Sequence, residues 1–451
     1  MNQNNLQRSL GLFPATNIVV ANMIGAGIFT TSGLLMAGLN NPLLMLGLWV
    51  AGGFIALCGA LSYGELGASM PGAGGEYHFL SKLYSPLFGF LSGWVSFIVG
   101  FSAPIAASAI GFSEYFCRAL PAIPGWLEGS GIMSVEATKS SLSVLVIIIF
   151  SFIHYRGTKS GALIQNILTI LKVALIIMLL LSGFLSDKGE AGNFSSGGWV
   201  SPGLSGWKTI GLSLMWIMFA YSGWNASTYL GAELKNPSKT LPRSLILGTG
   251  IVMILYLGLN MLYIYGINPT QMKGVISVGG LAMGNLFGNS ADRLFSLLIS
   301  FALFSSLSAF IIIGPRVYYA MAKDGLFFKS VARIHPKYKV PSNSIILQSV
   351  IGIIMVLSGT FEQVLTYMGF ALGIFPILTV TGVFILRRNN PTALKMKGFP
   401  YTQIIYVSTG ILILVLSFME RPFESSVASF TVLAGIPAYY LFKTTNRKLE
   451  S

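Results

Sequence analysis

Long hydrophobic runs, separated by short polar connections, dominate this chain. Residues 9–64 contain no Asp, Glu, Lys or Arg, and an uncharged run of that length suits hydrocarbon rather than water. Charges and Pro, Gly or Asn turns divide the sequence into twelve such runs. They cover residues 14–39, 42–66, 84–116, 141–155, 161–184, 208–233, 243–266, 284–321, 342–359, 363–386, 403–419 and 426–442. The pattern predicts an all-α membrane protein with 12 transmembrane helices.

Composition and charge agree with this class. Only 9% of the 451 residues are charged, whereas soluble domains carry about 25%. The net charge of +14 does not point to a nucleic-acid partner, because the basic residues fall in short loops between hydrophobic runs. If the N-terminus is cytoplasmic, 20 of the 28 Lys and Arg residues lie on the cytoplasmic side and 7 on the other. The positive-inside rule then predicts a multi-pass cell-membrane protein with both termini in the cytoplasm.

Two of the hydrophobic runs are interrupted near their centres. The first contains the sequence IGAGIF at residues 24–29, and the sixth contains FAYSGWN at residues 219–225. Glycine weakens a helix, and unwound backbone at membrane depth is tolerated only where it is buried in protein or lines a cavity. Runs one and six are five apart, and this odd offset makes equivalent helices enter the membrane from opposite sides. We therefore expect one domain over residues 1–451, with inverted repeats at about 14–184 and 208–386 and two further helices at about 403–442.

An interrupted helix offers complementary groups for a zwitterion. The start of its second half presents free N–H groups and the positive end of a dipole, and the end of its first half presents free carbonyls. Gly25, Ala26 and Gly27 allow a carboxylate to approach the backbone, while carbonyls near Ile24 and Phe219 can receive an ammonium group. The alternative is that these glycines only let helices pack closely. The matching break in the sixth run favours binding.

Four motifs carry a resemblance to a known family. They are NMIGAGIFTTSG at 22–33, YGELGASMPGAGGEYHFLSKLYSPLFGFLSGW at 63–94, FAYSGWNASTYLGAEL at 219–234 and PRVYYAMAKDGLF at 315–327. By these motifs the chain resembles the amino acid–polyamine–organocation (APC) superfamily, and within it the light chains of L-type amino acid transporters and their bacterial relatives. The resemblance implies a LeuT-like fold, with a five-plus-five inverted repeat and broken helices 1 and 6, and amino acids as substrates.

The resemblance also implies roles for residues at the two breaks. The first break would bind the substrate carboxylate, carbonyls beside both breaks would receive the amino group, and Phe219 would cover the substrate as an aromatic gate. The candidate substrate-binding residues are Ile24, Gly25, Ala26, Gly27, Phe219, Ala220, Ser222 and Gly223.

Lys172 is a candidate for coupling. It lies about 12 residues into the fifth run, which corresponds to about 18 Å of helical rise and to the middle of the membrane. An ammonium group at that depth costs at least about 2.5 kcal/mol, unless the side chain extends toward an interface. By the resemblance, a lysine here stands in for the cation of sodium-coupled members. We expect either a fixed charge that braces the first helix against the eighth or a titrating group that couples protons.

Acidic residues are scarce in the hydrophobic runs. Glu65 lies at the inner end of the second run, where structural pairing with loop bases is expected, and Glu114 lies at the outer end of the third. This scarcity argues against a cationic substrate and against an acidic sodium site. The sequence shows no phosphate loop, metal cluster or nucleophile–base arrangement, so we expect neither an enzyme nor a bound cofactor or metal.

These observations predict a sodium-independent transporter of neutral L-amino acids that works by alternating access. Exchange is favoured over proton symport by the resemblance alone. One alternative is a proton-coupled or cationic amino acid or polyamine permease, and another is a transporter-like amino acid sensor. The expected partners are an amino acid and the lipid bilayer. The sequence does not indicate an accessory subunit and leaves the need for one open.

Overall fold

The computed structural model describes residues 8, 10–72, 74–156, 158–198, 203–338, 340–391 and 394–450. Within it, only the backbone is described for residues 158–166, 316, 320 and 445–450. Of the basic residues counted above, Lys339 lies outside this part of the chain, as do the side chains of Lys159, Arg316, Arg447 and Lys448.

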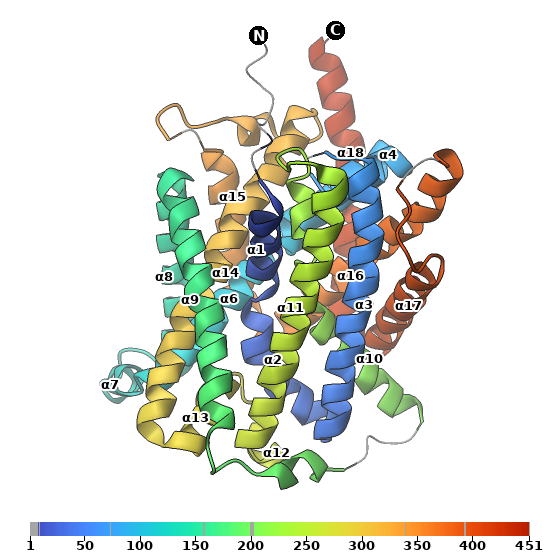
Figure 1. Ribbon diagram of the computed structural model, residues 1–451. Helices are drawn as coiled ribbons and strands as arrows, with labels where there is room; N and C mark the ends of the chain where they lie inside the picture. The colour runs from blue at the N-terminus through green and yellow to red at the C-terminus, as the bar shows by residue number, and fades with distance from the viewer. Residues whose placement is uncertain are drawn as a thin grey trace.

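Helices form almost all of the described chain, and the long ones run side by side as a bundle (Figure 1). Both ends of the chain lie at the same end of this bundle (Figure 1). In chain order the helices are α1 (Leu12–Met23), α2 (Ala26–Leu39), α3 (Pro42–Ser69), α4 (Glu76–Leu83), α5 (Pro86–Val95), η1 (Ser96–Gly100), α6 (Ser102–Ala119), α7 (Ala122–Gly129), α8 (Val135–Tyr155), α9 (Thr158–Phe184), η2 (Ala191–Ser195), α10 (Leu204–Ala220), η3 (Ala226–Tyr229), α11 (Pro237–Gly266), α12 (Pro269–Met272), α13 (Val278–Phe287), α14 (Asn289–Lys323), η4 (Lys329–Ala332), α15 (Ser342–Ser358), α16 (Phe361–Asn389), α17 (Tyr401–Glu420) and α18 (Pro422–Glu450).

Ten stretches of the described chain are long and apolar enough to cross a membrane. The chain is therefore a multi-pass membrane protein. The ten are α1 with α2, α3, α5 with η1 and α6, α8, residues Ile167–Phe184 of α9, α11, α14, α16, α17 and residues Pro422–Thr444 of α18. The remaining two predicted runs fall on α10 and α15, which have 17 residues each and are shorter than a typical span of about 20 residues.

The first break separates α1 from α2. Helix α1 ends at Met23, and Gly25 caps α2 in an extended conformation with φ −113° and ψ −159°. The interruption therefore lies at residues 24 and 25, and Ala26 and Gly27 already belong to the first turn of α2. This is slightly earlier than the 25–27 centre expected from the glycine pattern, because glycine also serves well as a helix N-cap.

The second break follows α10, which ends at Ala220. Residues 221–225 form turns, and only the short 3₁₀ helix η3 follows before α11. Gly223 has φ +93°, a left-handed conformation that glycine adopts without steric cost. The segment predicted to be helical over 208–233 therefore stops 13 residues early, because residues 221–225 form turns.

The two breaks meet inside the bundle. In the span Leu12–Leu39, 89% of the residues in the most hydrophobic stretch are buried inside the protein, against 28% in α8. A Cβ atom on Gly27 would lie only 2.6 Å from the Cα of Ala220, so a glycine is required where α2 crosses the end of α10. The broken helix is thus central, and α8, α17 and α18 are peripheral.

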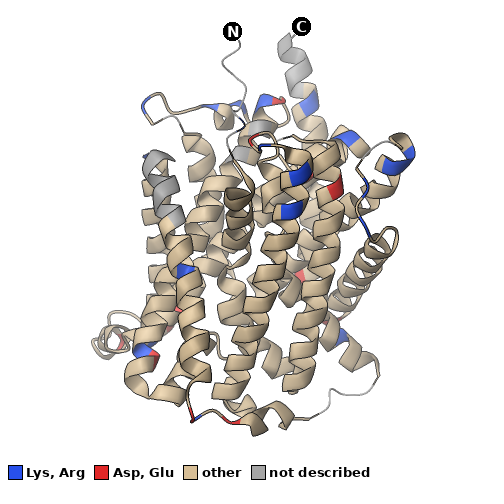
Figure 2. Ribbon diagram, viewed as in Figure 1, with Lys and Arg blue, Asp and Glu red and all other residues tan. Residues whose placement is uncertain are grey.

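Charged residues gather at the ends of the bundle. Figure 2 shows most Lys and Arg at the end that carries the two termini, and only a few charged residues between the ends. Glu65 at this end forms an ion pair with Arg387, and Arg118 pairs with Asp292 at the ends of α6 and α14.

Candidate functional site

The start of α2 is a cradle of backbone N–H groups. Gly25 provides no side-chain cap, and the first N–H groups of a helix have no partner within it. Gly25, Ala26 and Gly27 line a small cavity together with Phe219 and Ala220 from the end of α10. Free N–H groups and the positive end of the helix dipole favour a carboxylate at this position.

A larger cavity of about 140 Å³ adjoins this cradle. Phe219 and Ser222 are among the residues that line both spaces, so they lie where the two cavities adjoin. Gly223 lines the larger cavity only. Its other walls come from several helices and are mostly apolar, and they include Phe101, Pro104, Met218, Phe310, Ile313, Leu372 and Pro376.

Helix α5 continues into α6 through a wide π-helical turn, η1, that the hydrophobic pattern does not reveal. Ser96 and Gly100 of this turn and Phe101 directly after it line the larger cavity. Such turns are frequent at functional sites, because they leave backbone groups unpaired and redirect side chains.

Ile24 faces away from both cavities toward Lys172. Its carbonyl accepts hydrogen bonds from the Lys172 ammonium group and from Ser306 Oγ, the latter at 3.1 Å. A carbonyl oxygen has two lone pairs, so both are in use. Of the eight candidate residues, seven line at least one of the cavities and Ile24 lines neither.

Lys172 is fully buried near the middle of α9. Besides Ile24, its Nζ donates to the Ala21 carbonyl at 3.3 Å and to Ser306 Oγ at 3.2 Å. Among the ion pairs of the described chain, none includes this lysine. Its positive charge instead lies at the carbonyl end of α1, where the helix dipole is negative. These contacts tie α9, α1 and α14 together at the first break.

Tyr256 connects the two breaks and had no signal in the sequence. From α11, its hydroxyl donates to the Met23 carbonyl at 2.5 Å and to the Ala220 carbonyl at 3.0 Å. A tyrosine in a hydrophobic run is ordinary, and only the fold shows that its hydroxyl reaches both helix ends.

Glu76 is a second residue that the sequence analysis passed over. It begins α4, between two spans, yet only 8% of its surface is exposed and it lines the larger cavity. A buried acid therefore does line the cavity, so the scarcity of acids in the hydrophobic runs is no argument against a cationic substrate. The residue follows two glycines in the second family motif, but it lies outside the hydrophobic runs, so its burial could not be read from hydropathy.

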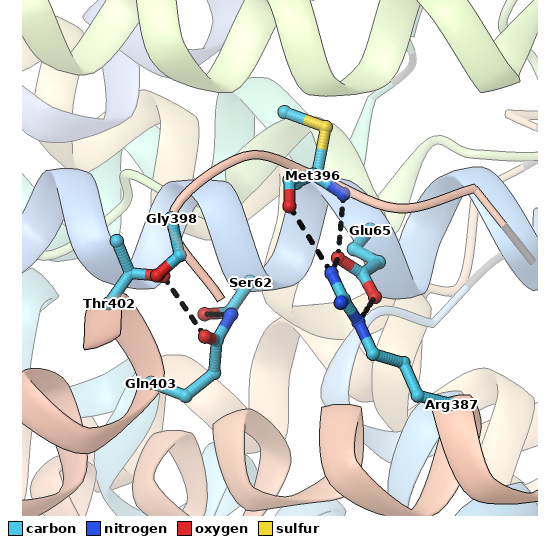
Figure 3. Close-up of polar contacts among 7 residues, drawn as sticks. All are labelled: Ser62, Glu65, Arg387, Met396, Gly398, Thr402 and Gln403. Atoms are coloured by element: carbon cyan, nitrogen blue, oxygen red, sulfur yellow. Dashed lines mark hydrogen bonds and ion pairs between the residues drawn. The ribbon is translucent and has the colours of Figure 1, made fainter. Parts of the chain in front are cut away.

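Glu65, in contrast, has the structural role expected for it. Its side chain is buried and accepts from Arg387 Nε at 2.6 Å and Nη2 at 2.7 Å, and from the Met396 N–H at 2.8 Å (Figure 3). Beside this group, Gln403 Nε2 donates to Ser62 Oγ at 3.1 Å (Figure 3). These contacts fasten α3 to α16 and to the connection before α17.

The part of the chain that the structure describes contains no group of three His, Cys, Asp or Glu side chains arranged to hold a metal ion. The helix ends at the two breaks present backbone amides and carbonyls, which suit the charged ends of an organic zwitterion.

Comparison with known proteins identifies the family. A family model described as amino acid permease matches residues 10–441. This chain belongs to the amino acid permease family, within the APC superfamily.

Several characterised transporters are similar over nearly the whole chain. The serine/threonine exchanger SteT of Bacillus subtilis is 29% identical over 447 residues, which is 98% of each chain. The mouse b(0,+)-type amino acid transporter 1 is 27% identical over 97% of this chain and 88% of its own. The human large neutral amino acids transporter small subunit 2 is 25% identical over 97% of this chain and 80% of its own. The family and these relatives are transporters, not enzymes, and SteT is named as an exchanger.

Proposed function

We propose that this chain is a sodium-independent transporter that exchanges small neutral L-amino acids across the cell membrane by alternating access. The observation that carries the proposal is the meeting of the two interrupted helices. Free N–H groups of α2 and the C-terminal end of α10 line one cavity. This arrangement suits the two charged ends of an amino acid, whatever its side chain.

In this proposal the substrate carboxylate binds the N–H groups of Ala26 and Gly27. The N–H of Gly25 already donates to the Met23 carbonyl at 2.7 Å, so Gly25 contributes space rather than a donor. The ammonium group binds carbonyls at the ends of the first half-helices. The Phe219 carbonyl already accepts from the Ser222 N–H and the Ala220 carbonyl from Tyr256 Oη, whereas the Ile24 carbonyl would first have to release Lys172 or Ser306.

The rest of the substrate extends beside the second break. Ser222 and Gly223 line that route, and Phe219 lies between the two cavities as a gate. A cavity of about 140 Å³ with mostly apolar walls favours a small neutral side chain, because cavities for larger ligands measure about 300–1,000 Å³.

Sodium independence is supported by the position of Lys172. Its ammonium group already occupies the space between two backbone carbonyls and Ser306 Oγ. Oxygen atoms of this kind would be the ligands of a bound sodium ion, and the Lys172 side chain already fills the space among them. Lys172 therefore replaces the coupling ion in this proposal.

The proposed architecture has twelve membrane crossings, with α10 and its continuation after the break forming the sixth and α15 the ninth. Inverted repeats at about 14–184 and 208–386 put the two broken helices in corresponding positions, and α17 and α18 follow outside the repeats. The excess of Lys and Arg at the end with the termini supports a cytoplasmic location for both (Figure 2).

Glu76 supports a second candidate function on the same fold. A buried carboxyl group in the cavity wall would suit a permease for cationic amino acids or polyamines, or one that couples transport to protons.

Flux measurements on purified protein in proteoliposomes test the proposal. We expect labelled serine, threonine or alanine to enter only when an unlabelled neutral amino acid is present inside, with no change when sodium is replaced by choline. Strict dependence on sodium would contradict the proposal. Saturable binding of these amino acids without flux would instead identify a sensor, and selective uptake of lysine or putrescine would favour the second candidate.

A further inference from the structure

Glu76 lies in the wall of the central cavity and takes no part in binding the substrate backbone. It shares this wall with Asn225 and Tyr229, which follow the second break. Within the described residues no ion pair includes Glu76. Burying a carboxylate without a cationic partner costs free energy, so the surroundings of Glu76 destabilise its charged form.

Neutral groups hold the Glu76 carboxyl in place. Tyr63 Oη donates to its Oε1 at 2.7 Å, and Asn225 Nδ2 donates to the same oxygen at 2.9 Å. Ser92 of α5 provides a third side-chain hydrogen bond. Donors stabilise the charged form, but a hydroxyl can also accept the proton of the neutral acid. The same cluster can therefore accommodate both protonation states without a change of partner.

The other titratable groups around Glu76 are tyrosines. They are Tyr63 of α3, Tyr229 of η3 and Tyr406 of α17. On the α5 side the facing polar group is Ser92, and α16 meets α4 through Gly382 against Leu83 and Tyr84. On α4 itself, Tyr77 donates to Asp324, His78 packs against Gly72 and Lys82 is exposed.

Glu76 is also in direct mechanical contact with the second break. A Cβ on Gly75 would lie 2.7 Å from the Tyr229 ring, and a Cβ on Gly231 would lie 2.6 Å from the Gly72 carbonyl. The glycine-rich loop before α4 therefore packs directly against residues 229–231. Through Asn225, a change in the Glu76 carboxyl acts on the segment that follows α10.

We propose that Glu76 is a proton-binding site of the transport cycle, and that the central cavity closes on its protonated form. Closure removes water from the cavity wall, which penalises a carboxylate that has no counter-ion. A proton bound from the open cavity removes that penalty. The inference rests on the proposed function only in that the cavity opens and closes during transport, and it applies to an exchanger without net proton movement.

The sign of the pH dependence follows from the carboxyl group. Burial raises the pKa of Glu76 to about 7, so both forms are populated near neutral pH. Closure requires the protonated form of Glu76. This form is fully populated well below the pKa, and its population falls as the pH rises through the pKa. For one such group, the protonated fraction falls about tenfold between about pH 6 and about pH 8.

The test is the pH profile of amino acid exchange in proteoliposomes, with the same pH on both sides. We expect wild-type exchange to fall about tenfold between about pH 6 and about pH 8, and the rate of Glu76→Gln to be independent of pH. Glu136→Gln, which removes an exposed acid at the start of α8, is the matched control and should keep the wild-type profile.

Tyr63→Phe provides a second, milder variant. It keeps the ring that packs edge-on against Trp224, at 4.7 Å between centroids, but removes one donor to the charged carboxyl. The midpoint of the profile should therefore move to higher pH. A packing defect alone would lower the rate at every pH without moving the midpoint, so this variant decides the matter if Glu76→Gln does not fold.

Several results would overturn the inference. A wild-type profile in Glu76→Gln, or an unmoved midpoint in Tyr63→Phe, would show that Glu76 does not bind the relevant proton. Selective loss of lysine or putrescine transport in Glu76→Gln would show that the carboxylate recognises a substrate cation instead.

Failure of the proposed function is distinguishable, because it would appear as absence of amino acid exchange at every pH. The proton site can then be tested by infrared titration. A carboxyl band that disappears near pH 7 in the wild type and is missing from Glu76→Gln supports it, and an identical titration in both proteins contradicts it.

Discussion

Two glycines of the first break stand two residues apart in very different surroundings. At Gly27, a Cβ atom would collide with the Ala220 backbone at 2.6 Å. At Gly25, the nearest atoms to a Cβ are the Met23 carbonyl oxygen at 3.8 Å and Ser306 Oγ at 4.0 Å, which are ordinary contacts. The glycine pattern in the sequence treats both positions alike, and only the packing separates them.

This difference gives a matched pair of variants. Gly27→Ala should force α2 away from α10 and destabilise the protein by about 1–3 kcal/mol, the usual cost of overpacking. Gly25→Ala should cost clearly less. Thermal unfolding in detergent measures the contrast, and equal melting temperatures for the two variants would show that the helices do not meet at Gly27.

Lys172 allows a second prediction at this scale. Lys172→Met keeps a long side chain but leaves the Ala21 carbonyl without its donor and the Ile24 carbonyl with one donor fewer, which costs about 1–3 kcal/mol for each unpaired group. We expect the first break to loosen and the affinity for substrate to fall about tenfold or more.

The control for Lys172 is Lys208→Met, which removes a partly exposed pair with Glu420 at 3.5 Å and should cost about 0–1 kcal/mol. Titration of substrate by thermal shift measures both variants. Wild-type affinity in Lys172→Met would mean that the lysine does not shape the site.

Individual residues differ in how far the sequence could reveal them. Lys172 stands out because a charge in a hydrophobic run is expensive wherever the helix packs. Glu76 does not stand out, because an acid in a glycine-rich connection is ordinary until the connection folds back against the second break. Hydrophobicity along the chain predicts that residues of a hydrophobic run lie in the membrane. It does not predict whether a residue in a loop is buried.

At the scale of elements, one hydroxyl group connects the two half-helices. It is that of Tyr256, which contacts the C-terminal ends of both α1 and α10. Tyr256→Phe removes the donor shared by the Met23 and Ala220 carbonyls and should destabilise the protein by about 1–3 kcal/mol. Met23 retains the Gly25 N–H, so the larger effect is expected at Ala220 and on substrate binding.

Tyr263→Phe, on the same helix, is the control. The Tyr263 hydroxyl is buried and has no hydrogen-bond partner among the described residues, so its removal should be neutral or slightly stabilising. Melting temperatures of both variants test the idea, and an equal loss in Tyr263→Phe would mean that helix packing, not the two carbonyls, determines the result.

Element boundaries could largely be predicted where hydropathy determines them. The run expected at 84–116 appears as Pro86–Ala119, and that at 363–386 as Phe361–Asn389. The sixth helix ends earlier than the pattern predicts, because residues 221–232 carry no charge that would mark its end, although their backbone turns. Hydropathy predicts which segments of the chain enter the membrane. The residue at which a helix ends depends instead on hydrogen bonds and on tertiary contacts, such as that of Gly223 with Asn22.

At the scale of the whole molecule, the charges are divided between the two ends of the bundle. The sequence could predict this division from the loops alone, because each span reverses the direction of the chain. It could not predict which helices touch, since most hydrophobic residues satisfy many packings equally well. The central position of α1 and α2 and the closeness of Gly27 to Ala220 are therefore properties of the fold.

Orientation in the membrane follows from this division and can be tested by labelling. Both native cysteines, Cys58 and Cys117, are buried, so an impermeant maleimide should react little with the wild-type protein. Lys443→Cys adds an exposed thiol at the end with the termini, and Lys273→Cys adds one in the connection after α12 at the opposite end (Figure 1).

The excess of basic residues predicts that the end with the termini faces the cytoplasm. In intact cells we therefore expect the maleimide to label Lys273→Cys at once and Lys443→Cys only after permeabilisation. A count of basic residues tests each loop separately, whereas this labelling result depends on the number of crossings between the two thiols. Labelling of both thiols from outside would mean that an even number of crossings lies between them instead of the predicted five, and the inverted-repeat assignment would fail with it.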